Sequence, residues 1–259
     1  MSVNNFNPLH PHWDIFCVVV DNYGDIGVTW RLAKQLVAEY DIPINLWVDD
    51  LLSFSHILPM LDPHKSKQIF NGVNIFQWNN PIDIEFIAGN VVIEAFACEL
   101  PSQIKSTINQ LHQHPLSRAP TWLNLEYLSA EDWVEGCHGL PSSQPGGVKK
   151  WFYFPGFTPK TGGLICEREL FNQRDEWQAD SKHKLALFNK LGLQGIDAKD
   201  TVISVFSYET PALAALCELW QTSPSPIHAL IPKGRSLHSL TSILPCDIKD
   251  LMPGQQFTI

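Results

Sequence analysis

The segment "VVVDNYGDIGVTWRLAKQL", residues 18–36, lies where a strand gives way to a helix and decides the fold of the chain. An uninterrupted run of β-forming residues from 14 to 20 leads into it, which is typical of a strand buried on both faces of a parallel sheet. Beyond Gly27, apolar residues recur at helical spacing as far as Val37. Another apolar run at 44–50 follows, and a right-handed crossover between two such strands is strongly favoured. The sequence therefore predicts a strand–helix–strand unit and a parallel sheet.

More strands of the same kind are predicted along the first half of the chain. The runs at 73–78, 91–96 and 121–127 are rich in β-forming residues, and a helix is expected over 101–113. An aromatic strand in "KKWFYF" (149–154) precedes a glycine-rich loop. This order predicts an α/β, doubly wound domain.

The second half repeats the pattern on a smaller scale. A polar, helix-prone stretch ends at Gly192, and strands are expected to begin at 201, 227 and 255. We therefore predict an N-terminal Rossmann-like domain (1–165), a helical linker (166–195) and the incomplete start of a second Rossmann-like domain (196–259), because so few strands bury too little apolar surface to be stable alone.

Composition narrows the class of protein. The 259 residues are 44% hydrophobic and 17% charged, as in ordinary globular domains, and the net charge of −9 disfavours nucleic acid as a partner. The chain has no run of 18 apolar residues and no basic-then-apolar leader, so we expect a cytoplasmic protein without a membrane partner. Six cysteines never form a C-x-x-C pair, and "HPH" (10–12) reads as a mobile terminus, so no metal site is expected.

Two carboxylates mark the opening segment as a candidate site. Asp21 follows the first strand, at the edge where open α/β sheets bind ligands. Asp25 stands where the helix begins, so it is either a helix N-cap or a second site residue. Gly24 and Gly27 are predicted to form a glycine loop, but the spacing is N-x-G-x-x-G, not the G-x-G-x-x-G of dinucleotide-binding proteins. Negative charge here would repel a pyrophosphate, so the loop suits a cation or proton transfer.

Four stretches together resemble one family. "VVDNYGDIGVTWRLAKQL", "LNLEYLSAEDWVE", "FPGFTPKTGGLI" and "VFSYE" are similar to EarP, the bacterial protein-arginine rhamnosyltransferases that modify elongation factor P. The resemblance runs from the first strand to the end of the chain.

The resemblance implies a GT-B fold, in which two Rossmann-like domains face each other across a cleft. It implies an inverting transfer of L-rhamnose from dTDP-β-L-rhamnose to an arginine of elongation factor P, without a metal or other cofactor, and it makes Asp21 and Asp25 the catalytic pair. Residue chemistry agrees, since a guanidinium is a poor nucleophile while it keeps its proton and delocalised lone pair. We assign Asp25 as the general base and Asp21 as the group that orients the guanidinium.

The resemblance also assigns a donor site. Phe206 and Tyr208, in "VFSYE", correspond to aromatic residues that contact the thymine end of the donor; the alternative is that Phe206 is core and Tyr208 lies at the surface. The family's diphosphate-binding stretch would follow residue 259, so we expect the second domain to be truncated and this chain alone to be inactive.

Two other functions stay open on the sequence. A non-catalytic module that docks elongation factor P is one, and a nucleotide-dependent oxidoreductase on a Rossmann sheet is the other.

Overall fold

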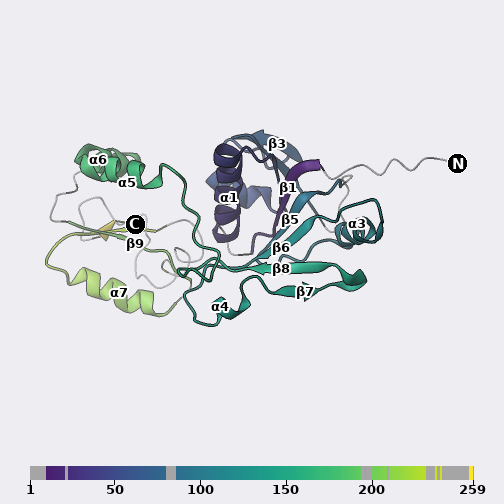
Figure 1. Cartoon of the computed structure of the whole chain (residues 1–259). Helices are drawn as coiled ribbons and strands as arrows, with labels where there is room; N and C mark the ends of the chain where they lie inside the picture. The colour runs from purple at the N-terminus through teal and green to yellow at the C-terminus, as the bar shows by residue number, and fades with distance from the viewer. Residues whose placement is uncertain are drawn as a thin grey trace. The chain divides into compact units, whose positions relative to one another are not determined.

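The computed structural model describes residues 10–20, 23–79, 86–193, 196, 200–208, 210–231, 237, 240 and 257–258. The chain divides into two compact units, residues 1–168 and 169–259 (Figure 1). The stretch that the sequence suggested as a helical linker therefore begins within the first unit and continues as helices of the second.

The first unit is built on one eight-stranded sheet of order β3-β4-β2-β1-β5-β6-β8-β7. Its strands are parallel except for the two edge pairs, β3 with β4 and β7 with β8. The strands are β1 (His10–Cys17), β2 (Ile44–Val48), β3 (Lys67–Phe70), β4 (Val73–Gln77), β5 (Gly89–Ala95), β6 (Thr121–Leu125), β7 (Pro141–Ser143) and β8 (Lys149–Tyr153). The helical segments are α1 (Gly24–Tyr40), α2 (Leu51–Ile57), α3 (Ser102–Gln113), α4 (Val134–Cys137) and η1 (Pro145–Gly147). The α/β class and the parallel sheet are confirmed.

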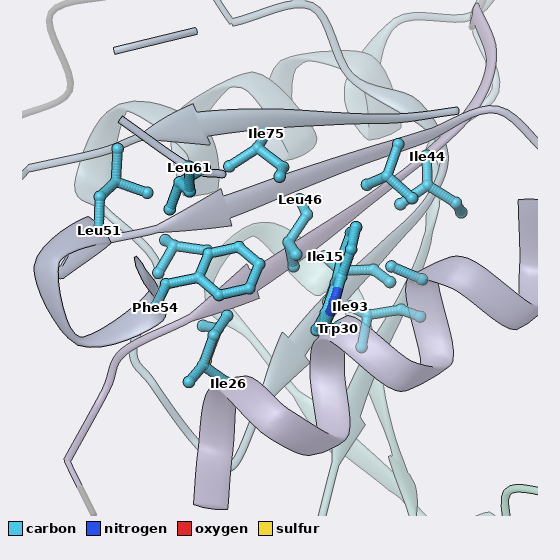
Figure 2. Close-up of a cluster of buried hydrophobic side chains, with 14 of the residues drawn as sticks. Ile15, Ile26, Trp30, Ile44, Leu46, Leu51, Phe54, Leu61, Ile75 and Ile93 are labelled. Carbon is cyan, nitrogen blue, oxygen red and sulfur yellow. The ribbon is translucent and has the colours of Figure 1, made fainter. Parts of the chain in front are cut away.

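Alternate residues of each strand point to opposite faces of the sheet. The strands carry apolar residues on both faces, so helices cover both faces. On one face, Ile26 and Trp30 of α1 point toward Ile15, Leu46 and Ile93 of the strands (Figure 2). Residues of α2, among them Phe54, belong to the same buried cluster. This packing fixes where α1 begins, just beyond the carboxyl end of β1.

The other face carries an aromatic core. Phe16 of β1 stacks on Trp47 of β2 with ring centroids 5.5 Å apart, and Trp47 stacks on Phe76 of β4 at 4.5 Å. Ile104 and Ile108 of α3 complete this cluster. A sheet with apolar cores on both faces is doubly wound, as predicted.

The first strand begins earlier than the sequence suggested. His10 pairs with Gly89 of β5, and the ring Nε2 of His12 lies 3.2 Å from Oδ2 of the buried Asp14. Asp14 also accepts a hydrogen bond of 2.9 Å from the N–H of Gly89. The prediction of a mobile terminus at residues 10–12 is therefore wrong, because backbone pairing and a buried carboxylate hold them in β1.

A short segment at the end of the first unit, residues 165–168, lies along α1. Arg31 binds both carboxylate oxygens of Glu167 at 2.6 Å, which holds the pKa of Glu167 below its ordinary value. Residues 31, 35 and 39 are four apart and share one helix face. Arg31 Nη2 also donates to the carbonyl O of Ile165 at 3.3 Å, Gln35 Nε2 donates to the carbonyl O of Cys166 at 2.7 Å, and the N–H of Arg168 donates to Glu39 Oε1 at 2.7 Å.

The second unit has a three-stranded parallel sheet of order β11-β10-β9. Its elements are α5 (Leu170–Ala179), α6 (Ser181–Lys190), β9 (Thr201–Ser204), α7 (Ala212–Gln221), β10 (Ile227–Leu230) and β11 (Phe257–Thr258). Its core includes Leu213, Cys217 and Trp220 of α7 against Ile227 and Ala229 of β10. The predicted restart of the strand–helix–strand pattern is confirmed.

Candidate active site

Asp25 lies at the carboxyl edge of the large sheet, in the first turn of α1. Its side chain is buried, and each oxygen accepts a hydrogen bond: Oδ2 from the N–H of Val20 at 3.0 Å and Oδ1 from the hydroxyl of Tyr127 at 2.8 Å. Bonds to both oxygens fix the plane of the carboxylate. A buried, oriented carboxylate at this edge is placed as a site residue of an open α/β sheet would be.

Two predictions about the opening segment are wrong in detail. The N-cap of α1 is Tyr23, so Asp25 is not the cap but a residue of the first turn. Gly24 and Gly27 both lie inside α1, so they do not form a glycine loop. A Cβ added at Gly27 would lie 3.8 Å from Cδ1 of Ile57, which is an ordinary van der Waals contact. The helix therefore begins at Gly24, earlier than a glycine loop would allow, and Ile26 and Trp30 in its first two turns are buried in the core.

Asp21, the other predicted catalytic carboxylate, lies outside the described residues. The loop before it is held by carboxylates: the N–H of Val19 donates to Asp49 Oδ1 at 2.9 Å, and that of Val20 to Asp25. Asp49 follows β2, so acidic groups after neighbouring strands fix this loop.

Tyr127 is a site residue that reasoning from the sequence missed. It follows β6, and its hydroxyl reaches Asp25 across 102 positions of sequence. Its ring stacks on Phe96, with centroids 4.3 Å apart and an interplanar angle of 12°. A signal was present, since Tyr127 is the last residue of the strand predicted at 121–127, at the carboxyl edge where open α/β sheets bind ligands.

The thiol of Cys17 feels the charge of Asp25 and is kept neutral. Cys17, at the end of β1, is fully buried, and burial raises the pKa of its thiol from 9.0 to about 12, with the charges of Asp25 and Asp49 adding to the effect. A protonated thiol is a weak nucleophile, so Cys17 serves packing and not chemistry.

A cluster of polar side chains lies on the sheet face that carries the aromatic core, beside Trp122. Lys150 of β8 pairs with the buried Glu94 of β5 at 3.0 Å, and Asn124 Nδ2 donates to Glu126 Oε1 at 2.5 Å. Burial raises the pKa of Glu126, and the charge of Glu94 adds to this. These contacts could not be predicted from local pattern, because Glu94, Asn124 and Lys150 lie on three different strands.

The two predicted donor-binding aromatics lie in the second unit, after β9. Phe206 is 77% exposed and Tyr208 62% exposed, so the alternative that Phe206 belongs to the core is wrong. Their role in binding a nucleotide stays a prediction.

Within the described stretches, no group of three or more His, Cys, Asp or Glu side chains is placed to hold a metal ion. None of the helices in the described part of the chain is long and apolar enough to cross a membrane.

Comparison with known proteins shows consistent likeness to one family. Residues 13–258 match the family described as Elongation-Factor P (EF-P) rhamnosyltransferase EarP. The chain is 65% identical over 251 residues to a protein-arginine rhamnosyltransferase of Shewanella oneidensis, with 96% of this chain and 64% of that protein covered. It is 47% identical over 250 residues to a protein-arginine rhamnosyltransferase of Pseudomonas putida, with 95% and 64% covered.

A solved structure gives the same result. It comes from work on EarP-mediated arginine glycosylation of translation elongation factor EF-P and has 27% identity and a TM-score of 0.50, covering 95% of this chain and 58% of that one. The chain thus spans just under two thirds of the length of the curated relatives described above. Since the family match covers nearly all of its residues, the chain belongs to the EarP family of elongation factor P rhamnosyltransferases.

Proposed function

We propose that this chain carries the acceptor side and the general base of an enzyme that transfers L-rhamnose from dTDP-β-L-rhamnose to an arginine side chain of elongation factor P. Family membership supports the reaction class. The observation that carries the proposal is the buried carboxylate of Asp25, oriented by Val20 and Tyr127 at the carboxyl edge of the sheet. Family membership also removes the oxidoreductase alternative.

The chemistry needs such a carboxylate. A guanidinium keeps its proton at neutral pH and is a poor nucleophile in that form. In the proposed step, one guanidinium nitrogen attacks the anomeric carbon of rhamnose and a C–N bond forms. The bond from that carbon to the diphosphate oxygen breaks, and dTDP leaves with its electron pair. The proton lost from the nitrogen passes to Asp25, and attack opposite the leaving group inverts the anomeric carbon.

The two aspartates take different parts in this proposal. Asp25 accepts the proton because its carboxylate is held in one orientation by hydrogen bonds. Asp21 binds the guanidinium by charge-assisted hydrogen bonds and so turns the reacting nitrogen toward the sugar. Anionic groups around a guanidinium also favour its binding over that of neutral side chains, which selects arginine as the acceptor.

The donor is assigned to the second unit. Phe206 and Tyr208 present exposed rings after β9, at the carboxyl end of a parallel strand. In the proposal, the thymine base of the donor stacks on these rings. The proposed reaction uses no metal and takes place in the cytoplasm, where elongation factor P acts.

One experiment tests the proposal. The chain, extended to the length of its relatives, is incubated with dTDP-β-L-rhamnose and elongation factor P, and the acceptor is weighed by mass spectrometry. A gain of one deoxyhexose on an arginine is expected, and the Asp25→Asn variant should lose it. Acceptor binding without any mass gain would instead support a module that docks elongation factor P without catalysis.

A further inference from the structure

Two hydrogen bonds keep the carboxylate of Asp25 in place. Its carboxylate is attached to Cβ by a single bond about which rotation is broad unless hydrogen bonds restrict it. The N–H of Val20 restrains Oδ2, and the hydroxyl of Tyr127 restrains Oδ1. The first restraint comes from the backbone of the loop between β1 and α1, whereas the second comes from a side chain that follows β6, far away in the sequence.

Tyr127 is itself held by an aromatic partner. About half of its side chain is exposed, so burial alone does not fix its ring. Stacking on Phe96, at 4.3 Å and nearly parallel, restricts the ring and directs its hydroxyl toward Asp25. The N–H of Phe96 in turn donates to the carbonyl of Leu125 at 2.7 Å, which ties the loop after β5 to the end of β6.

The backbone that presents Phe96 is strained. Phe96, Ala97 and Glu99 have φ of 55°, 52° and 52°, a left-handed conformation that residues with side chains seldom adopt. Such residues persist only where their surroundings determine them, and they concentrate at functional sites. Here the N–H of Cys98 also bonds the carbonyl of Ala95 at 3.1 Å, which closes the strained turn.

We propose that Tyr127 is a positioning residue for the general base: its hydroxyl, held by stacking on Phe96, orients Asp25 to accept the proton of the acceptor guanidinium. This inference rests on the proposed function. The hydrogen bond from the Tyr127 hydroxyl aligns the carboxylate before the acceptor arrives. Tyr127 therefore acts on the rate of proton transfer and contributes little to acceptor affinity.

The test separates turnover from binding. In the extended enzyme, Tyr127→Phe keeps the ring and its stacking but removes the hydroxyl, so kcat should fall about 10- to 100-fold while KM for elongation factor P changes less than about threefold. Tyr153→Phe is the matched control, because Tyr153 donates to the carbonyl of Gly162 at 2.6 Å and not to the site. It should retain kcat.

Double variants show whether Tyr127 acts through Asp25. In the Asp25→Asn background, Tyr127→Phe should cause no further loss of kcat, because the carboxylate that it orients is gone. Unchanged kcat in Tyr127→Phe alone, or an equal further loss in the double variant, would overturn the proposal.

A double-mutant cycle measured by thermal stability tests the contact between Tyr127 and Asp25 without relying on the reaction. In the 259-residue chain, the loss of Tm in the double variant should be smaller than the sum of the two single losses, because the variants break one shared hydrogen bond. Additive losses would overturn the pairing even if the enzyme transfers no rhamnose at all. Absence of transfer by the wild-type enzyme, by contrast, would overturn the proposed function while the cycle still reports on Tyr127.

Discussion

Lys150 and Glu94 form a buried ion pair that crosses a strand. Lys150 lies on β8 and Glu94 on β5, both neighbours of β6, and Nζ and Oε2 are 3.0 Å apart with the side chains 16% and 3% exposed. The lysine passes the ring of Trp122 on β6, at 5.4 Å from its centroid. The ion pair therefore joins β5 to β8 across β6 on one face of the sheet.

Breaking this pair should destabilise the first unit. Lys150→Met leaves Glu94 charged and unpaired in the interior, so the free energy of unfolding should fall by about 3–5 kcal/mol, measured by urea denaturation. The neighbouring, exposed Lys149→Met is the control and should change it by less than about 0.5 kcal/mol. Adding Glu94→Gln to Lys150→Met should recover part of the loss; no recovery would mean that the charge of Glu94 is not the cause.

Asp25→Asn should lower rhamnosyl transfer about 10²- to 10⁴-fold with the fold intact, because the proposed general base loses its charge but not its volume. Asp41→Asn is the control at the other end of α1, where Asp41 is exposed and adopts a left-handed conformation that Asn tolerates. Asp21→Asn should reduce transfer as strongly. Normal turnover in Asp25→Asn would mean that Asp25 is not the general base and only holds the loop before α1. A large loss of Tm in this variant would mean that Asp25 has a structural role.

Phe206→Ala and Tyr208→Ala should each weaken binding of dTDP by about 1–3 kcal/mol, as base–aromatic stacking does in other nucleotide sites. Isothermal titration calorimetry of the extended enzyme measures this, and affinity for elongation factor P should stay constant. Phe171→Ala, an exposed aromatic of α5 in the same unit, is the control. Unchanged dTDP affinity in both variants would refute the donor assignment.

The cysteines should react in a fixed order with iodoacetamide at pH 8. Cys166 is exposed and should be labelled in the native chain, while Cys17 and Cys98, whose pKa values are raised mainly by burial, should be labelled only after unfolding. The unfolded chain releases the Cys17 proton near pH 9 and the folded chain near pH 12, so stability should fall as pH rises above about 9. Rapid native labelling of Cys17 would contradict its burial.

Strands that are marked by an apolar run in the sequence were predictable. A strand that forms only because it pairs with a neighbouring strand was not. Apolar runs indicated β2, β4, β5 and β6 within a few residues. The edge strand β7, "PSS", has no apolar pattern and exists because it pairs with β8. At the site, Asp25 could be found by its place after a strand, but its bond to Tyr127 joins residues 102 positions apart, and no spacing in the sequence encodes that distance.

The segment at 165–168 makes α1 the anchor of the chain where the first unit ends. Arg31, Gln35 and Glu39 bind this segment from one face of the helix, and Arg31 lies about 9 Å along the helix axis from Asp25, since six residues separate the two positions. The helix that carries the proposed general base therefore also fixes the last residues of the first unit.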